Sequence, residues 1–157
     1  MRSAGGSVGS HLFFYGVLLG EVASARIGAL LAGLGPGRPA VARGTLYTVQ
    51  NPRGWYPVLL ACDGASIGEA GQPVRGMVHE AGSVDIAALD RFEGVDPADA
   101  RAGEYRRAPI SVTPDGDPPL MAQAYLYNHA PAPAFERIPH GDFARWLRET
   151  GRRPFAG

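Results

Sequence analysis

Apolar and polar residues alternate along several short segments of the chain, which is the pattern of strands buried on one face. The clearest is VRGMVHEA (74–81), in which Val74, Gly76 and Val78 occupy alternate positions. Pro57 favours an edge position for one of the other strands, because proline cannot donate a ladder hydrogen bond. The remaining strands are predicted at the start of 11–19 and over 41–49, 55–63, 105–114 and 119–128.

Three other segments place apolar residues at helical spacing. The first, 21–35, is expected to end at Gly33 and Gly35. The last, 141–149, has Asp142 near its start and presents one apolar face made of Phe143, Trp146 and Leu147.

The middle helix has a clear start signal and a clear stop signal. Ser83 is expected to cap its N-terminus, with Asp85 in the first turn, and Gly94 to cap its C-terminus in a left-handed conformation. Its inward face is predicted to hold Ile86, Leu89 and Phe92. An acid, Glu93, precedes the glycine, although a helix C-terminus carries partial negative charge and favours basic residues. The acid at this end therefore needs an explanation.

Turn signals separate these elements. PGRP (36–39) and NPRG (51–54) predict turns, and PDGDP between 105–114 and 119–128 predicts a hairpin. Strands follow one another with helices inserted between only some of them, which differs from the strict alternation of a doubly wound α/β sheet. We therefore predict an α+β fold, a mixed β-barrel of about six strands with about three packed helices.

Length and composition add limits to this picture. The 157 residues fit one domain, predicted over 11–157 after a flexible lead-in at 1–10. Net charge is zero and the 15 basic residues, all Arg, are scattered, so we expect no nucleic-acid partner. No apolar run reaches the length of a membrane span, and the default prediction is a cytoplasmic protein. The single cysteine, Cys62, rules out an internal disulfide and is expected to be a buried, inert thiol. Oligomeric state is not readable from the sequence.

Two tempting motifs lack the structural context that their chemistry needs. Residues 5–9 match G-x-S-x-G, but a nucleophile elbow requires a buried strand before the serine, and none is predicted there. The four histidines lack metal-ligand spacing, so we expect no metal site. The chain has no P-loop or dinucleotide-binding loop, so we expect no organic cofactor either.

Four stretches in order carry a family resemblance: FFYGVLLG, GTLYTVQNPRGWYPVLL, VRGMVHE and LDRFEGVDPADARAGEYRR. Their order is similar to that of the gamma-glutamylcyclotransferase-like family, which includes the AIG2-like proteins. In that family a Tyr-Gly-Ser-Leu-like loop follows the first strand, and a helix ending L-D-x-x-E-G precedes a Y-x-R segment. The resemblance runs from about Phe13 to Tyr127.

The resemblance implies a gamma-glutamylcyclotransferase-like fold and a set of site residues. The family's catalytic glutamate corresponds to Glu93. Its substrate-holding loop, which acts largely through backbone N–H groups, corresponds to Tyr15, Gly16, Val17 and Leu18. Tyr105 and Tyr127 are further candidate substrate contacts, although their residue type and strand positions favour packing roles.

The implied reaction is the cyclisation of a γ-glutamyl amine or γ-glutamyl amino acid. The free α-amine attacks its own γ-carbonyl, 5-oxoproline forms and an amine leaves. Because the attack is intramolecular, correct folding of the substrate can supply an effective molarity of roughly 10⁵–10⁸ M. One carboxyl group with a pKa near 7 can accept and return the proton, and we expect the helix end and nearby Phe92 and Val95 to raise the pKa of Glu93.

Two other functions stay open at this point. Val17 stands where the family usually has Ser or Thr, which preserves a backbone role but removes a hydroxyl. The chain is then either a cyclotransferase, a noncatalytic small-molecule-binding protein of the same fold, or an amide hydrolase that uses the same pocket.

Overall fold

A computed structural model describes residues 10–61 and 71–157 of the chain. The residues 5–9 motif, Cys62 and most of the predicted lead-in lie outside the described residues. The elements in chain order are β1 His11–Phe14, α2 Ala25–Gly28, the 3-10 turn η1 Ala29–Leu31, β2 Gly37–Asn51, β3 Gly54–Ala61, β4 Gln72–Glu80, α3 Ile86–Glu93, β5 Tyr105–Pro114, β6 Leu120–Tyr127, β7 Glu136–Arg137 and α4 Phe143–Thr150.

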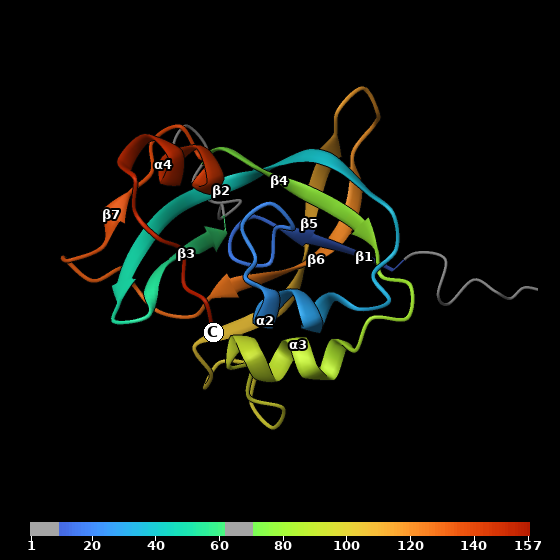
Figure 1. Ribbon diagram of the computed structural model, residues 1–157. Helices are drawn as coiled ribbons and strands as arrows, with labels where there is room; N and C mark the ends of the chain where they lie inside the picture. Colours follow the sequence, from blue (N-terminus) through green and yellow to red (C-terminus); the bar gives the residue numbers. More distant parts are fainter. Residues whose placement is uncertain (1–9, 62–70) are drawn as a thin grey trace, which may run out of the picture.

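Five strands form a closed mixed barrel (Figure 1). Each strand pairs with the next in the order β2-β4-β1-β6-β5, and β5 then pairs back onto β2. Only β1 and β6 run parallel; the other pairs are antiparallel. β3 and β7 pair with β2 outside this ring, so β3 occupies the edge position that Pro57 predicts. The predicted α+β barrel with packed helices is confirmed.

The long strand β2 pairs with different strands along its two halves. Its first half, from Gly37 to Gly44, pairs with β4, and its second half, from Gly44 to Asn51, pairs with β3. The core is apolar, and alternation places Val74 and Val78 of β4 inside it. Its largest fully buried side chains are Phe13, Phe143, Leu12, Ile27, Leu46, Leu59, Leu89 and Ile138.

Two predictions near the N-terminal helix are wrong. The helix over 21–35 is reduced to α2 and η1, with Ser24 capping α2 through the N–H of Ile27. Residues 37–39 of the turn predicted at 36–39 belong instead to β2, where Pro39 lies opposite Met77. Long-range pairing with β4 decides the conformation of this segment, and it overrides the local turn tendency of proline and glycine.

The boundaries of α3 and α4 follow their capping chemistry. Asp85, and not Ser83, caps α3, because its carboxylate accepts the N–H of Ala88 at 3.0 Å. Gly94 ends α3 in the left-handed conformation, with φ 73°, as predicted. α4 begins after its N-cap Asp142. The sequence did not predict β7, because two residues are too few to show a period.

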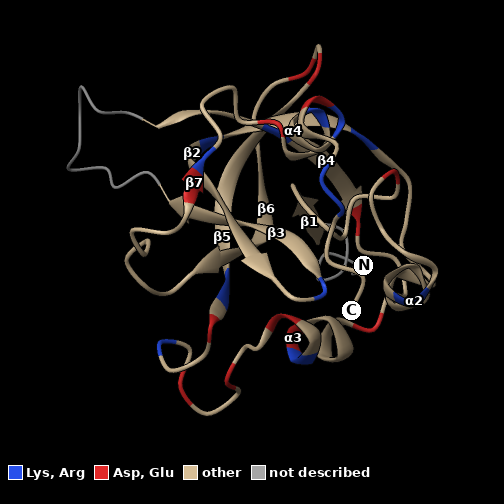
Figure 2. Ribbon diagram, turned by 60° about the vertical axis from the view of Figure 1, so that its left-hand side comes forward, with Lys and Arg blue, Asp and Glu red and all other residues tan. Residues whose placement is uncertain are grey.

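Acidic and basic residues are scattered along the described chain and do not form one block of a single sign (Figure 2). Within that part of the chain no helix is long and apolar enough to cross a membrane.

Candidate active site

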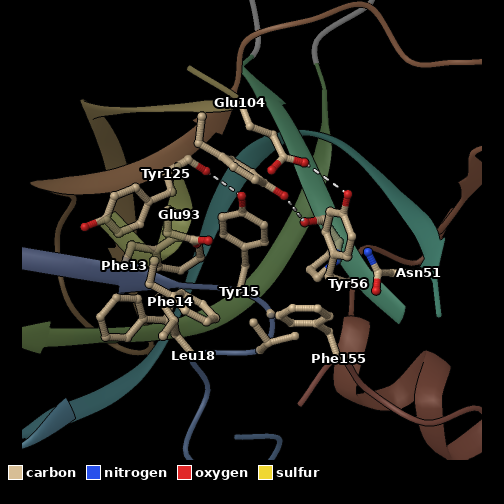
Figure 3. Close-up of a pocket in the computed structure, with 15 residues that line it drawn as sticks. Phe13, Phe14, Tyr15, Leu18, Asn51, Tyr56, Glu93, Glu104, Tyr125 and Phe155 are labelled. Carbon is tan, nitrogen blue, oxygen red and sulfur yellow. Dashed lines mark hydrogen bonds between the residues drawn. The ribbon is translucent and has the colours of Figure 1, made fainter. Parts of the chain in front are cut away.

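A cavity of about 140 Å³ opens between the end of α3, the turn after β1 and the strand β3 (Figure 3). Aromatic side chains supply much of its wall, and Glu93 and Glu104 supply its charge. It is lined by Phe13, Phe14, Tyr15, Gly16, Val17, Leu18, Asn51, Tyr56, Pro57, Phe92, Glu93, Glu104, Tyr105, Tyr125 and Phe155. None of the described residues that line it is basic.

Glu93 reaches the cavity because of the way α3 is held and ended. Leu89, one turn earlier, is fully buried and fixes the helix against the barrel. The left-handed Gly94 stops the helix immediately after Glu93. The Glu93 carboxylate forms no hydrogen bond or ion pair with any described residue, and Figure 3 shows its side chain among the aromatic residues of the cavity. A carboxylate in this position is available to a ligand.

Burial raises the pKa of Glu93 from its ordinary 4.5 to about 8, and the negative charge of Glu104 adds to this effect. Desolvation is the larger cause, because an apolar wall disfavours the charged form. The upward direction agrees with the sequence-based expectation, but the contribution of Glu104 was not foreseen. A pKa near neutrality suits a group that must both accept and donate a proton.

This pKa predicts a pH-dependent difference in stability between the protein and Glu93→Gln. The pKa is higher in the folded than in the unfolded chain, so folding favours the protonated form. That stabilisation is complete below about pH 4.5 and is lost as pH rises through about 8. Glutamine never ionises, so the Tm advantage of Glu93→Gln should grow between pH 5 and pH 9. Allowing for water in the cavity, we expect about 1–3 kcal/mol, or roughly 3–10 °C, by thermal denaturation.

Glu80→Gln, at an exposed position at the end of β4, provides the matched control and should show no such growth. A constant difference in Tm between Glu93→Gln and the parent across this pH range would contradict the raised pKa.

The turn that follows β1 faces the same cavity. The Leu19 N–H donates to the Gly16 carbonyl at 2.9 Å and closes the turn. The Tyr15 hydroxyl donates to the Tyr125 carbonyl and ties the turn to β6. The backbone N–H groups of residues 16–18 donate no hydrogen bond to any described residue, although Val17 and Leu18 are buried. Buried N–H groups almost always have a partner, so free donors beside a cavity indicate a place for a ligand's oxygen atoms.

Gly16 allows the turn to lie against β3. A Cβ atom at this position would lie 2.3 Å from Cγ and 2.7 Å from Cδ of Pro57. Both are atoms of a rigid ring, so a larger residue would displace the turn. The close approach explains why a glycine is needed here.

The two tyrosines predicted as substrate contacts differ in position. Tyr105 lines the cavity, but its hydroxyl donates to the Pro57 carbonyl at 2.9 Å. Tyr127 is not among the lining residues; its ring packs edge-on against Tyr105, with centroids 5.6 Å apart. The structure therefore brings together Glu93, the 15–18 turn and Tyr105, and leaves Tyr127 behind Tyr105.

A family model described as "Gamma-glutamyl cyclotransferase, AIG2-like" matches residues 12–146, well over half of the chain. The chain belongs to this family. Among curated proteins no match was found. The helix end carrying Glu93 and the turn carrying Gly16 both lie within the part of the chain that the family model matches.

Solved structures share the fold of this AIG2-like chain at low sequence identity. YkqA from Bacillus subtilis is 23% identical with a TM-score of 0.63; 90% of this chain is covered, but only 42% of YkqA. An AIG2-like protein from Mus musculus is 20% identical with a TM-score of 0.59, covering 85% and 87% of the two chains. A structure titled gamma-glutamyl cyclotransferase is 18% identical with a TM-score of 0.56, covering 82% and 69%. At these identities the likeness concerns the fold.

Several cavity residues of this AIG2-like chain were missed by the sequence analysis. Glu104, Tyr56 and Phe155 come from three separate segments, and only the fold brings them together. The Tyr56 hydroxyl donates to Glu104 at 3.0 Å, and the rings of Tyr56 and Phe155 lie 5.9 Å apart. The sequence contains no spacing that would have joined these positions.

Asp90, one turn before Glu93 on α3, has three hydrogen bonds to neighbouring strands. It accepts the Tyr125 hydroxyl at 2.7 Å and receives the Arg107 guanidinium at 2.9 and 3.3 Å through its two oxygens. Arg107 also donates to Gln123 at 3.3 Å. This network joins α3 to β5 and β6 one turn before Glu93. Asp90 is therefore a positioning residue for the helix end.

We expect Asp90→Ala to lower the free energy of unfolding by about 2 kcal/mol, since Arg107 and the Tyr125 hydroxyl lose their partner. Chemical denaturation measures this loss. Arg91→Ala, which removes a charge from the exposed neighbouring position of α3, should change stability by less than about 0.5 kcal/mol. Equal effects of the two variants would show that the network does not hold the helix.

No group of His, Cys, Asp and Glu side chains that could hold a metal ion occurs within the described ranges.

Proposed function

We propose that this protein cyclises a γ-glutamyl amine or γ-glutamyl amino acid to 5-oxoproline and releases the amine. One observation carries the proposal: the Glu93 carboxyl group, with a pKa of about 8 and no partner among the described residues, lines the same small cavity as residues 16–18, whose backbone N–H groups donate to no described residue. Membership of the family supports the reaction type. The cytoplasmic location stays a prediction.

In this reaction Glu93 transfers protons, and the turn after β1 holds the substrate in position. The α-ammonium of the substrate pairs with the Glu93 carboxylate, which then accepts a proton from it. The neutral amine attacks the γ-carbonyl, a C–N bond forms and the carbonyl oxygen becomes negative. In this scheme the backbone N–H groups of residues 16–18 bind substrate oxygens, including this developing oxyanion.

Collapse of the intermediate breaks the bond to the leaving nitrogen. Glu93 returns its proton to that nitrogen, and the attacking nitrogen loses its second proton as the lactam forms. The attacking nitrogen thus gives up two protons in total and the leaving amine gains two. No water is added and no external acid or base is consumed. A single carboxyl group with a pKa near 8 is suited to these sequential transfers.

The test is incubation of the protein with a panel of γ-glutamyl amines and γ-glutamyl amino acids, followed by mass spectrometry of the products. We expect 5-oxoproline and the free amine in equal amounts. Free glutamate in place of 5-oxoproline would identify an amide hydrolase. Binding of the panel without any product would identify a noncatalytic binding protein.

A further inference from the structure

The C-terminal strap, residues 151–157, forms part of the cavity wall although it lies outside the residues matched by the family model. It runs beside β3: the Trp55 N–H donates to the Arg153 carbonyl at 2.9 Å, and the Phe155 N–H donates to the Trp55 carbonyl at 2.7 Å. These bonds place the Phe155 ring on the cavity.

A second contact holds the strap at its other end. The Arg152 guanidinium lies 4.3 Å from the ring centroid of Trp55 and 5.1 Å from that of Trp146. Arg152 also pairs with Glu136 at 2.7 Å. The position of Phe155 is therefore defined by several contacts, and the strap is a fixed wall of the site.

Phe155, Tyr56 and Glu104 contact one another in sequence along one side of the cavity. Its ring lies 5.9 Å from Tyr56 and 6.3 Å from Phe92. The Tyr56 hydroxyl donates to one carboxylate oxygen of Glu104 at 3.0 Å, and the other oxygen has no partner in the described chain. Glu104 is exposed, so it stands where the cavity meets solvent. We call Phe155, Tyr56 and Glu104 the strap-side wall.

We propose that the strap-side wall is the subsite for the leaving amine and that it selects γ-glutamyl conjugates of diamines, whose second ammonium group pairs with Glu104. The inference rests on the proposed function. The γ-glutamyl part is common to all such substrates, and we assign it to Glu93 and the 15–18 turn, which lie within the residues that the family model matches. The amine part differs between substrates, and Phe155 is a cavity residue outside the matched range, so we assign the amine to its side of the cavity.

Charge explains why the amine should be cationic at its far end. The cavity holds two carboxylates, and no described lining residue is basic. A γ-glutamyl alkylamine has one ammonium and one carboxylate; its ammonium pairs with Glu93, and Glu104 is left without a partner. A conjugate of a diamine brings a second ammonium for Glu104, while its hydrocarbon chain packs along Tyr56 and Phe155. Aromatic faces beside a cation add further attraction.

The test compares two substrates of equal length, γ-glutamyl-1,4-diaminobutane and γ-glutamyl-pentylamine, through kcat/KM for 5-oxoproline formation. The protein should prefer the first by roughly 5–20-fold, the range of one charge-assisted contact. Glu104→Gln should reduce this ratio to about one. The ratio is the informative quantity, because removing the Glu104 charge also lowers the pKa of Glu93, which affects both substrates alike.

Two further variants separate the parts of the wall. Glu80→Gln removes one negative charge from an exposed position away from the cavity and should keep the preference. Phe155→Ala should raise KM for both substrates, because both hydrocarbon chains use the ring. Equal kcat/KM values in the parent protein, or a preference that persists in Glu104→Gln, would overturn the inference and leave the cyclotransferase proposal intact.

Binding provides a readout that does not need turnover. Calorimetry with Glu93→Gln should show tighter binding of the diamine conjugate than of the pentylamine conjugate. Equal affinities, or no binding of either conjugate, would overturn the inference. Absence of 5-oxoproline from both substrates, together with this difference in affinity, would instead reject the cyclotransferase proposal and support the subsite.

Discussion

Glu93→Gln is expected to lower kcat/KM for 5-oxoproline formation by about 10²–10⁴-fold, the usual contribution of a general acid–base group. The amide keeps the size of the side chain but cannot accept the proton of the α-ammonium. It also cannot pair with that ammonium as a counter-ion. Steady-state kinetics with the best substrate of the panel measures the loss, with product followed by mass spectrometry.

Stability and catalysis should move in opposite directions in this variant. Glu93→Gln is expected to melt at a higher temperature than the parent at pH 9, so a loss of activity cannot be assigned to unfolding. Glu80→Gln, which makes the same change at an exposed position, should retain activity within twofold. Full turnover by Glu93→Gln would remove Glu93 from the mechanism.

The acid at the end of α3 was visible in the sequence as a conflict between residue type and position. The structure explains how it is tolerated. Glu93 lies in a cavity where its pKa is about 8, so without a ligand it is largely protonated at neutral pH and puts little negative charge beside the negative helix end; a bound ammonium group favours the carboxylate form. Local signals predicted the helix and its end at Gly94, whereas the role of Glu93 was implied only by the family resemblance.

The rest of the site depends on contacts between distant segments. Phe155 lies more than 60 residues from Glu93, and Glu104 is joined to Tyr56 across 48 positions. No period, cap or turn signal predicts such contacts. The same limit applies to the fold: the 36–39 segment carries turn residues, but pairing between β2 and β4 makes residues 37–39 part of a strand. The sequence predicts an element well where a cap or a hairpin turn ends it. It predicts an element poorly where pairing with a strand distant in sequence determines the backbone conformation.

Gly16→Ala is expected to lower kcat/KM by roughly 100-fold, since a displacement of about 1 Å in a positioning element can have that effect. The new methyl group would lie 2.3 Å from Cγ of Pro57, so the turn must move away from β3. Its free N–H groups would then miss the substrate oxygens. Overpacking should also lower the free energy of unfolding by about 1–3 kcal/mol. Kinetics and chemical denaturation measure the two effects.

Gly20→Ala is the matched control for Gly16→Ala. Gly20→Ala adds the same methyl group where no atom lies within 4 Å, so both activity and stability should stay close to the parent. The double variant Gly16→Ala with Pro57→Ala removes the Cγ and Cδ atoms and leaves the ordinary contact at 3.7 Å, so it should recover much of the activity. The Tyr105 bond is kept, because it is made to the backbone carbonyl of residue 57. Recovery of activity in the double variant would show that the fit of the turn against β3 sets the position of the N–H groups. Parental activity in Gly16→Ala alone would show that the turn does not hold the substrate.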